Sequence, residues 1–380
     1  MVFLIEPHGG KLVQRIISQE ESKKYLSNTT LERIEVSKAV LAEIENIALG
    51  SFSPLESFPI KKEFNSILES WHLTNGILFP IPPLFPVNKE VAKRIAIEKE
   101  IIITFENKPV AVIDVEEIFA FDKEKFIENV LKTKNQEHPG VQYVLGIGEF
   151  LVAGKASLLG QPILFGNTAW TPAEMRTEIQ NRGWQTIVAF STTNVPHRAH
   201  EYLQRQALEM ADGLLIHALD VIGKKEGPKY PHQLITESYF ALIDNYYPQK
   251  KVVFTMLPYL VRSAGPRSSI LQAIIRQNFG CTHQIFGRDH EGFSHCYGEF
   301  ESQEIFSKFP ELKIKPIFSK GPYYCQKCVQ IVTEDCCRHG SAREEISGTK
   351  VRALLGSNKE LPEHYLRPEV KAVLEEFKPS

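Results

Sequence analysis

Two histidines, His197 and His200, are the residues of this chain whose type and spacing most clearly suggest chemistry. The apolar, β-branched run 186–190 before them is typical of a buried parallel strand, and Pro196 is suited to the first position of a helix that continues towards Gly213. Because the two histidines are three residues apart, they lie on one face of the first helical turn, beside unpaired backbone N–H groups and the positive end of the helix dipole. This arrangement predicts a site for a phosphate chain.

The alternative interpretation of the same pair is structural, because two histidines at a helix N-terminus can serve only to cap and pack the helix. Zinc binding by the pair is disfavoured. The zinc-binding helix motif His-Glu-x-x-His places its histidines four residues apart, whereas these are three apart and Glu201 follows them. The choice between phosphate binding and a structural role therefore depends on motifs elsewhere in the chain.

A cluster of cysteines near the C-terminus is the second chemical signal. Cys325 and Cys328 are followed by the adjacent pair Cys336 and Cys337 and then by His339. This spacing predicts one tetrahedral zinc site made by Cys325, Cys328, His339 and one of the adjacent pair. Four protein ligands leave no open position for a substrate, so such a zinc would stabilise a loop. A redox pair or unligated thiols are the alternatives.

The elements that must position these residues fall into three regions. Residues 1–165 are predicted to be mixed β with short helices, with strands at 101–105, 110–113 and 143–146. Residues 166–320 alternate apolar strands with helices, which predicts a parallel, doubly wound sheet. Its candidate strands are 187–190, 213–218, 252–256 and 283–286. Residues 321–380 hold the cysteines and a helix that is expected to end near Phe377.

Composition limits the possible partners. The chain has 380 residues, of which 43% are hydrophobic, and a formal net charge of −2. A nearly neutral chain has no overall attraction to nucleic acid or to acidic membranes, so neither is an expected partner and anion binding must be local. No apolar run reaches the roughly 18 residues of a membrane span, and no signal-peptide pattern precedes the first strand. A cytoplasmic location is expected.

Four segments in order resemble the motifs of one enzyme family. Residues 191–200 are similar to Gln-Thr-Arg-Asn-x-Pro-His-Arg-Ala-His, the nucleotide motif of ATP sulfurylases (sulfate adenylyltransferases). Residues 260–267 resemble the Met-Arg-Tyr-Ala-Gly-Pro block of that family, 286–292 its Val-Gly-Arg-Asp-His-Ala-Gly block, and 346–352 its Ser-x-Thr-Lys-Val-Arg segment. Residues 7–12 and 53–58 near the N-terminus are also similar to segments of that family, so the resemblance spans nearly the whole chain.

The resemblance implies a fold and a set of partners. It identifies the three regions as an N-terminal PUA-like β domain (1–165), a central Rossmann-like α/β nucleotidyltransferase domain with a parallel sheet (166–320), and a small zinc-containing C-terminal domain (321–380). It implies ATP accompanied by Mg²⁺, a small oxyanion such as sulfate, structural zinc and a homodimer. Within the cysteine cluster it favours Cys336 over Cys337 as the fourth zinc ligand.

The resemblance also implies roles for individual residues. Sulfate would attack the α-phosphorus of ATP and release pyrophosphate, so the protein would chiefly position reactants and supply donors for developing charge. The residues implied in catalysis are Thr192, Asn194, His197 and His200. Those implied in nucleotide or anion binding are Ser191, Thr193, Arg262, Ala264, Gly265, Gly287, Arg288, Asp289 and His290.

Two positions depart from the family motif, and both concern the anion. Ser191 stands where the family has a glutamine that helps bind sulfate, and Thr193 stands where it has an arginine that bridges sulfate and phosphate. A neutral hydroxyl cannot replace a bidentate guanidinium. The segment 223–229 also differs from the family pattern, and its Lys225 or Lys229 would be the source of a compensating charge.

Three functions are consistent with this sequence. The first is a sulfate adenylyltransferase in which other cations compensate for the two changes. The second is a nucleotidyltransferase of the same fold that acts on a different acceptor. The third is a non-catalytic nucleotide-binding relative, which is least favoured because a scaffold would need neither Asn194 nor the two histidines.

Overall fold

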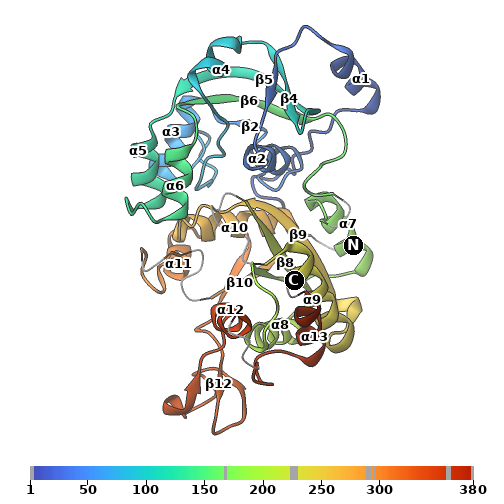
Figure 1. The fold of residues 1–380 in the computed structure, drawn as a ribbon, viewed down its shortest axis with the longest axis vertical. Helices are drawn as coiled ribbons and strands as arrows, with labels where there is room; N and C mark the ends of the chain where they lie inside the picture. Colours follow the sequence, from blue (N-terminus) through green and yellow to red (C-terminus); the bar gives the residue numbers. More distant parts are fainter. Residues whose placement is uncertain are drawn as a thin grey trace.

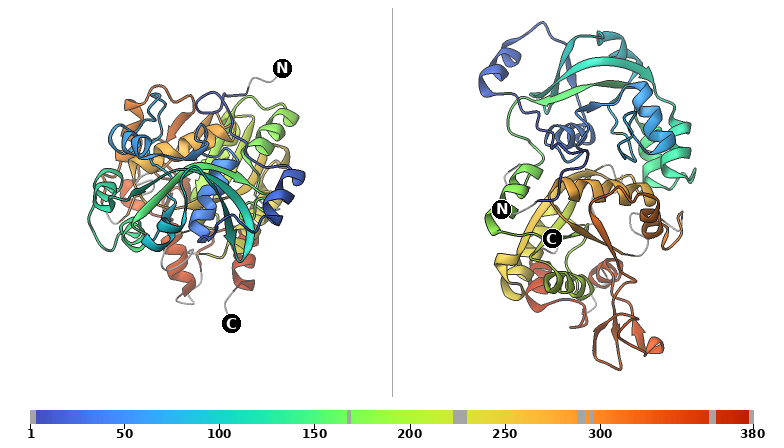
Figure 2. Two further views of the ribbon diagram at one scale, coloured as in Figure 1. Left: turned by 90° about the horizontal axis from the view of Figure 1, so that it is seen from above. Right: turned by 180° about the vertical axis from the view of Figure 1, so that it is seen from behind.

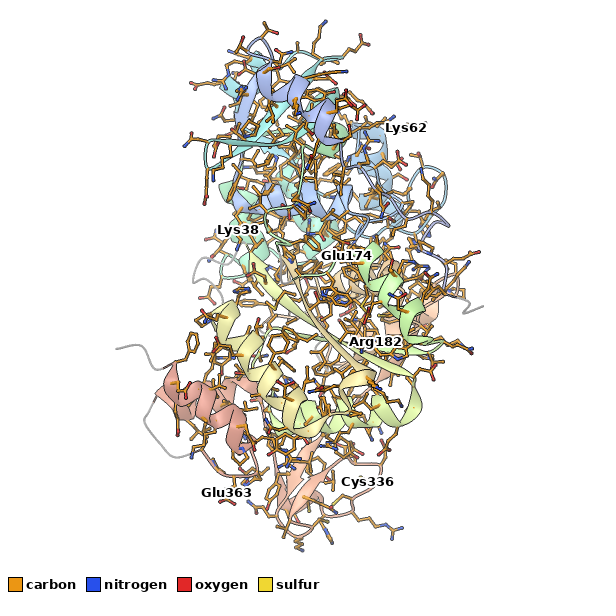
Figure 3. All side chains as sticks on the ribbon, turned by 90° about the vertical axis from the view of Figure 1, so that its right-hand side faces the viewer. Lys38, Lys62, Glu174, Arg182, Cys336 and Glu363 are labelled. Atoms are coloured by element: carbon orange, nitrogen blue, oxygen red, sulfur yellow. The ribbon has the colours of Figure 1, made fainter. Side chains whose placement is uncertain are left out.

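Three sheets follow one another along the long axis of the molecule (Figure 1). The computed structural model describes residues 4–166, 169–222, 230–287, 292–293, 296–356 and 361–377. The N-terminal sheet occupies one end, a parallel sheet the middle, and a small sheet with the cysteines the other end, as the view from behind also shows (Figure 2). Lys62 and Cys336 mark the two opposite ends in Figure 3. No helix in the described part of the chain is both long and apolar enough to cross a membrane.

The N-terminal sheet is mostly antiparallel and has the strand order β1-β4-β5-β6-β2, with β3 also beside β6. Its strands are β1 (Arg33–Glu35), β2 (Ser57–Phe58), β3 (Pro86–Val87), β4 (Glu100–Phe105), β5 (Lys108–Ala120) and β6 (Phe150–Leu158). The helices of this region are α1 (Gln19–Ser27), α2 (Lys38–Ala48), α3 (Lys61–Ser70), α4 (Lys89–Arg94), α5 (Lys123–Phe126), the π-helix η1 (Ile127–Leu131) and α6 (Pro139–Gly146). The strands predicted at 101–105 and 110–113 are confirmed as parts of β4 and β5.

The strand predicted at 143–146 is wrong, because these residues form the last turn of α6. The apolar run was short enough to suit either a strand or a helix, and the deciding signals lie just before it. Pro139 takes the first helical position, and the imidazole Nδ1 of His138 accepts a hydrogen bond from the backbone N–H of Val141 at 3.4 Å. A capped N-terminus of this kind starts a helix even when the following residues are apolar.

The middle sheet is parallel throughout, in the strand order β11-β10-β7-β8-β9. The strands are β7 (Ile187–Thr192), β8 (Gly213–Ile222), β9 (Val252–Leu260), β10 (His283–Phe286) and β11 (Lys315–Phe318). The helices are α7 (Pro172–Arg182), α8 (Arg198–Met210), α9 (His232–Tyr246), α10 (Pro266–Asn278) and α11 (Glu301–Glu304), with 3₁₀ turns η2 (Gln249–Lys251) and η3 (Ile305–Lys308). The predicted parallel α/β domain and its four candidate strands are confirmed.

The N-terminal and middle regions share a tightly packed boundary. Helix α2 contacts both β6 of the first sheet and β9 of the second, and it lies between the two sheets in Figure 1. At this boundary the guanidinium of Arg262, just after β9, forms a buried ion pair with Glu43 of α2. Arg267 of α10 donates to the backbone carbonyl oxygens of Ile67 and Leu68, at the end of α3, at 3.1 and 2.6 Å. The loop between β9 and α10 is therefore held by the N-terminal domain.

The C-terminal region contains the third sheet and two helices. The strands are β12 (Tyr323–Cys325), β13 (Gln330–Val332) and β14 (Arg343–Glu344), in the antiparallel order β13-β12-β14. A 3₁₀ turn, η4 (Gly340–Ala342), precedes β14, and the helices are α12 (Gly348–Gly356) and α13 (Pro368–Glu376). The helix expected to end near Phe377 is confirmed as α13, which packs against α9.

Candidate functional site

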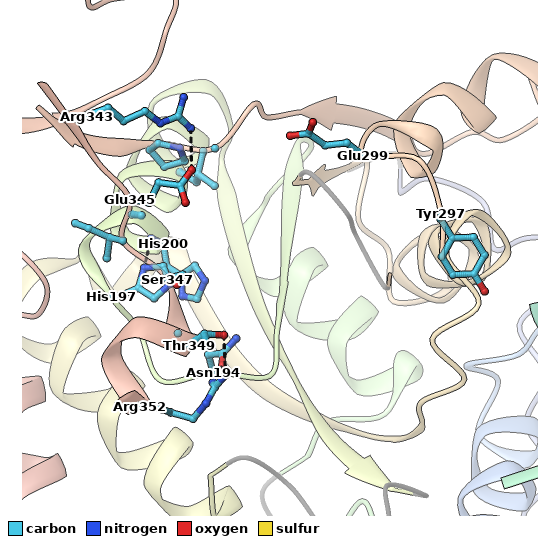
Figure 4. A pocket seen from close by; sticks show the side chains of 16 residues that line it. Asn194, His197, His200, Tyr297, Glu299, Arg343, Glu345, Ser347, Thr349 and Arg352 are labelled. Carbon is cyan, nitrogen blue, oxygen red and sulfur yellow. Dashed lines mark hydrogen bonds and ion pairs between the residues drawn. The ribbon is translucent and has the colours of Figure 1, made fainter. Parts of the chain in front are cut away.

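A cavity of about 780 Å³ opens beside the first turn of α8. One wall is the loop between β7 and α8 together with that first turn, and the opposite wall is the segment that runs from β14 into α12 (Figure 4). Its polar lining side chains are those of Asn194, His197, His200, Tyr297, Glu299, Arg343, Glu345, Ser347, Thr349 and Arg352. The cavity lies on the side of the parallel sheet where β7 ends, as is usual for ligand sites in this architecture.

His197 serves as the N-cap of α8. Its backbone is extended, and its imidazole Nδ1 accepts a hydrogen bond from the backbone N–H of His200 at 3.3 Å. Pro196 therefore precedes the cap instead of taking the first helical position predicted for it, because the side-chain cap moves the helix start to Arg198. Since Nδ1 is an acceptor, the neutral ring carries its proton on Nε2 and is a hydrogen-bond donor there.

The two imidazoles stack on each other and are neutral. Their ring centroids are 3.6 Å apart with planes 23° from parallel, and the edge of Phe190 packs against His200 with centroids 5.1 Å apart. Burial lowers the pKa of His197 well below its ordinary value, and the neighbouring His200 lowers it further. Burial also lowers the pKa of His200, to about 3. At neutral pH the pair therefore offers uncharged N–H donors to the cavity, not positive charge.

Asn194 connects the two walls of the cavity. Its side-chain Oδ1 accepts a hydrogen bond from the guanidinium of Arg352 at 2.7 Å. A Cβ atom added at Gly348 would lie 2.6 Å from the same Oδ1, so the start of α12 approaches Asn194 more closely than any larger residue would allow. The structure thus brings Asn194, His197 and His200 into one cavity, as the sequence predicts.

The other residues of the motif support the loop from behind. The Thr192 hydroxyl accepts from the backbone N–H of Asn194 at 3.1 Å and lies 3.3 Å from the Asn194 carbonyl oxygen. The Ser191 hydroxyl donates to Gln272 at 3.0 Å and accepts from Arg276 of α10 at 2.8 Å. Thr192, Ser191 and the half-buried Thr193 are not among the residues that line the cavity. Their direct contact with nucleotide or anion stays a prediction.

The second predicted block lies at the domain boundary. Arg262 is 3% exposed and donates to Glu43 and to the backbone carbonyl of Leu260, so it is not among the residues that line the cavity. Ala264 donates its backbone N–H to Ser268 at 3.1 Å. Gly265 has φ +50°, and a Cβ there would lie 2.7 Å from the ring of the cavity residue Tyr297. The block therefore supports the cavity through Tyr297, and the predicted ligand contacts stay predictions.

The third predicted block is described only at its start. Gly287 follows the C-terminal end of β10 and does not line the cavity. Arg288, Asp289 and His290 lie outside the described residues, as does the segment 223–229 with Lys225 and Lys229. The roles predicted for these residues stay predictions.

The first turn of α8 has a second face that joins it to the C-terminal segment. Glu201 is 3% exposed and receives hydrogen bonds from the guanidinium groups of Arg205 at 2.8 Å and Arg367 at 2.9 Å. The backbone N–H of Arg198 donates to the carbonyl of Tyr365 at 2.9 Å. The turn that presents the imidazoles to the cavity is thus held from its other side by the residues leading into α13.

The cysteine cluster gathers four ligand atoms, those of Cys325, Cys328, Cys337 and His339, within 4.8 Å of one another. Cys328 Sγ lies 3.7 Å from Cys337 Sγ and 3.3 Å from His339 Nδ1. A tetrahedral zinc with Zn–S bonds of about 2.3 Å requires sulfur atoms about 3.8 Å apart, so this donor set fits zinc. The predicted metal site is confirmed as a cluster that could hold a metal ion.

The choice of Cys336 as the fourth ligand is wrong, and Cys337 takes that place. Cys336 is exposed, and its sulfur accepts from the backbone N–H of Thr333 at 3.3 Å. Cys337 is buried, and its sulfur accepts from the backbone N–H of His339 at 3.4 Å. Adjacent residues point their side chains in different directions, and spacing along the chain could not decide which of the two faces the cluster.

Sequence reasoning missed the opposite wall of the cavity. Arg343, Glu345, Ser347, Thr349 and Arg352 lie about 150 residues beyond the histidine motif, and no local pattern joins the two segments. One signal was present, because Ser347, Thr349 and Arg352 belong to the segment 346–352 that resembles a family block.

Comparisons with known proteins agree with this architecture. The family model for ATP-sulfurylase matches residues 167–377, and that for the PUA-like domain matches residues 5–161. Sulfate adenylyltransferases of Staphylothermus marinus and Aeropyrum pernix are 41% and 40% identical to this chain, covering 98% and 96% of each of the two chains compared. The sulfate adenylyltransferase of Carboxydothermus hydrogenoformans is 39% identical, over 98% of this chain and 99% of its own.

A solved structure shares the fold at lower sequence identity. It is described as a hexameric APS kinase from Thiobacillus denitrificans, with a TM-score of 0.78 and 21% identity, and the match covers 99% of this chain and 69% of the other. The full-length relatives and the matching family models show that this chain belongs to the ATP-sulfurylase family.

Proposed function

We propose that this protein is a sulfate adenylyltransferase, which joins sulfate and ATP to give adenosine 5′-phosphosulfate and pyrophosphate. An oxygen of sulfate attacks the α-phosphorus and forms a new P–O bond. The bond from the α-phosphorus to the oxygen that bridges to the β-phosphorus breaks, and its electron pair leaves with pyrophosphate. The observation that carries the proposal is the pair of buried, neutral imidazoles lining one cavity with Asn194, in a chain about 40% identical to enzymes of this name.

The residues of the cavity suit this reaction because little covalent work falls to the protein. Charge accumulates on phosphate oxygens, and fixed N–H donors in a confined site stabilise it without having to reorient. The Nε2–H of His197 and the amide of Asn194 are such donors, and their side chains are held by a cap and by Arg352, respectively. Thr192 acts by fixing the backbone of Asn194. Positioning of this kind contributes to the rate by orienting the reactants.

Two metal ions belong to the proposal in different ways. Mg²⁺ would accompany ATP as its counter-ion and neutralise part of the charge on the phosphate chain. Zn²⁺ would be structural, held by Cys325, Cys328, Cys337 and His339, because four protein ligands leave no position for a substrate.

The test is pyrophosphate release measured with ATP and Mg²⁺, with and without sulfate. Sulfate-dependent release is expected. ATP binding without release under any condition would contradict the proposal and would favour a non-catalytic nucleotide-binding relative.

A second candidate function is transfer of the adenylyl group to a different oxyanion. The neutral Ser191 and Thr193, which replace the glutamine and arginine of the family motif, favour this alternative. The same assay with a panel of oxyanions and nucleoside triphosphates decides between them, since release that requires an acceptor other than sulfate would identify the second function.

The division into domains at 165 and 320, a cytoplasmic location and a homodimer complete the proposal. The homodimer is supported only by kinship with the family. Sedimentation of the purified full-length chain measures its mass in solution, and a monomer or a larger assembly would contradict the dimer.

A further inference from the structure

One charged side chain in the cavity has only neutral partners. The guanidinium of Arg352 donates to Asn194 Oδ1 at 2.7 Å and to Thr349 Oγ1 at 3.0 Å (Figure 4). It also lies 5.8 Å from the ring centroid of Tyr230. Within the described residues no carboxylate lies within 4.0 Å of it. None of the described carboxylates therefore forms an ion pair with this guanidinium.

The other arginines near the motif do not offer such a charge. Arg343 also lines the cavity, but it is paired with Glu334 at 2.9 Å and with Glu345 at 3.5 Å. Arg276 reaches Ser191, but its side chain is fully buried and does not line the cavity. Arg352 is thus the cavity arginine that forms no ion pair with a described carboxylate.

The position of Arg352 is fixed well enough to recognise a ligand. A guanidinium has five N–H donors, and two of its nitrogen atoms are occupied by Asn194 and Thr349. The contact with the Tyr230 ring restrains the plane of the group. Charge-assisted contacts from a rigid fork of donors suit a small tetrahedral oxyanion better than they suit a neutral group.

We propose that Arg352 binds the sulfate acceptor and is the guanidinium that remains for it in the cavity where position 193 is a neutral threonine. Thr193 is half-buried and does not line the cavity, but it directly precedes Asn194, the residue that holds Arg352, so an arginine at position 193 would begin next to the contact that Arg352 makes. Sulfate would then lie between Arg352 and the imidazoles. This inference rests on the proposed function and adds to it the residue that determines the acceptor.

The first test is Arg352→Gln, with Lys350→Gln as the matched control on the same helix. Glutamine is polar but neutral, so the substitution removes the charge. Because a hydrogen bond to a charged group contributes about 1.5–3 kcal/mol, we expect kcat/KM for sulfate to fall by roughly 10- to 100-fold, while the Kd for ATP stays within about twofold. Lys350 is exposed and does not line the cavity, so its change should leave both values as they are.

The second test is the double variant Arg352→Gln with Thr193→Arg. If position 352 supplies only charge, an arginine at position 193 should raise kcat/KM for sulfate at least tenfold above the value of the single variant Arg352→Gln. A purely structural role of Arg352 at the start of α12 would not be restored by a charge on the loop after β7. Thermal denaturation of each variant checks its folding, and if Arg352→Gln does not fold, the neutral Arg352→Met is measured in its place.

The outcomes separate this inference from the proposed function. Wild-type protein without sulfate-dependent pyrophosphate release would remove the proposed function. Active wild type with an unchanged kcat/KM for sulfate in Arg352→Gln or Arg352→Met would overturn only the role of Arg352. Parallel losses of ATP and sulfate affinity would also overturn it, since Arg352 would then bind the nucleotide.

Discussion

The imidazole of His197 caps a helix with one nitrogen atom, and we propose that it serves the reaction with the other. Nδ1 caps α8 by accepting from the backbone of His200, which leaves the proton on Nε2 for the cavity. The structural interpretation of this histidine is therefore confirmed, and it leaves Nε2 available for the chemical role that we propose. Burial keeps the ring neutral, so it contributes a donor and no charge.

His197→Asn should separate the two functions. Asparagine is among the best N-cap residues, so the free energy of unfolding should change by less than about 1 kcal/mol. The Nε2–H donor is lost, and the rate of sulfate-dependent pyrophosphate release should fall on the order of 100-fold. His197→Ala is the matched variant, because it should lose the cap and the donor together. Full turnover in His197→Asn would reduce His197 to a cap.

At the scale of single residues, the sequence predicted which side chains meet but not how they are held. Asn194, His197 and His200 share the cavity as expected. Arg262, which was predicted to bind nucleotide or anion, is buried against Glu43 on a helix of the N-terminal domain. This contact could not be predicted from a local motif, because the two residues are more than 200 positions apart. An arginine in a motif can bind a ligand or a distant carboxylate, and the local pattern is the same in both cases.

At the scale of elements, strand positions were predictable where the apolar run was bounded on both sides. The strand predicted at 283–286 coincides with β10, and that at 187–190 extends by only two residues to give β7. Helix α6 was not predicted, because the composition of 143–146 is typical of a strand. The capping histidine and the proline before these residues start a helix instead. The cysteine cluster was predictable as a set of possible metal ligands, but the choice between the adjacent cysteines depends on side-chain direction.

The zinc site provides a test at this scale. One zinc per chain is expected in the wild type and in Cys336→Ser, whereas Cys337→Ser should retain clearly less after dialysis, because it lacks one of the four converging ligands. Metal analysis of the dialysed proteins measures this difference. Loss of zinc from Cys336→Ser with full retention in Cys337→Ser would reverse the assignment.

At the scale of the whole molecule, several buried histidines couple the fold to pH. Burial is the leading cause that lowers the pKa of His8, His138, His197, His200 and His217 below their ordinary values. In the unfolded chain each has a pKa of about 6.5. The unfolded state therefore binds more protons below that pH, and stability must decrease as the pH falls from about 6.5 towards the lower pKa values of the folded state.

His217→Gln should measure the contribution of one such residue. His217 is fully buried in β8 and packs against Phe279 with ring centroids 4.5 Å apart. Between pH 6.5 and 5 the free energy of unfolding of the wild type should fall more steeply than that of the variant, by up to about 1.4 kcal/mol per pH unit. Urea denaturation at several pH values gives the slopes. The exposed His232→Gln is the control, and equal slopes for wild type and His217→Gln would contradict the argument.

The first turn of α8 is held by the same C-terminal segment that forms one wall of the cavity. One side of this turn carries the imidazoles that line the cavity. Its other side is joined to the residues that precede α13 by the hydrogen bond from Arg367 to Glu201. Helix α12 forms the opposite wall of the cavity and belongs to the same C-terminal stretch. The C-terminal segment therefore contributes both to the wall of the cavity and to the contacts that fix the first turn of α8, so truncating it before α12 should disturb the two together.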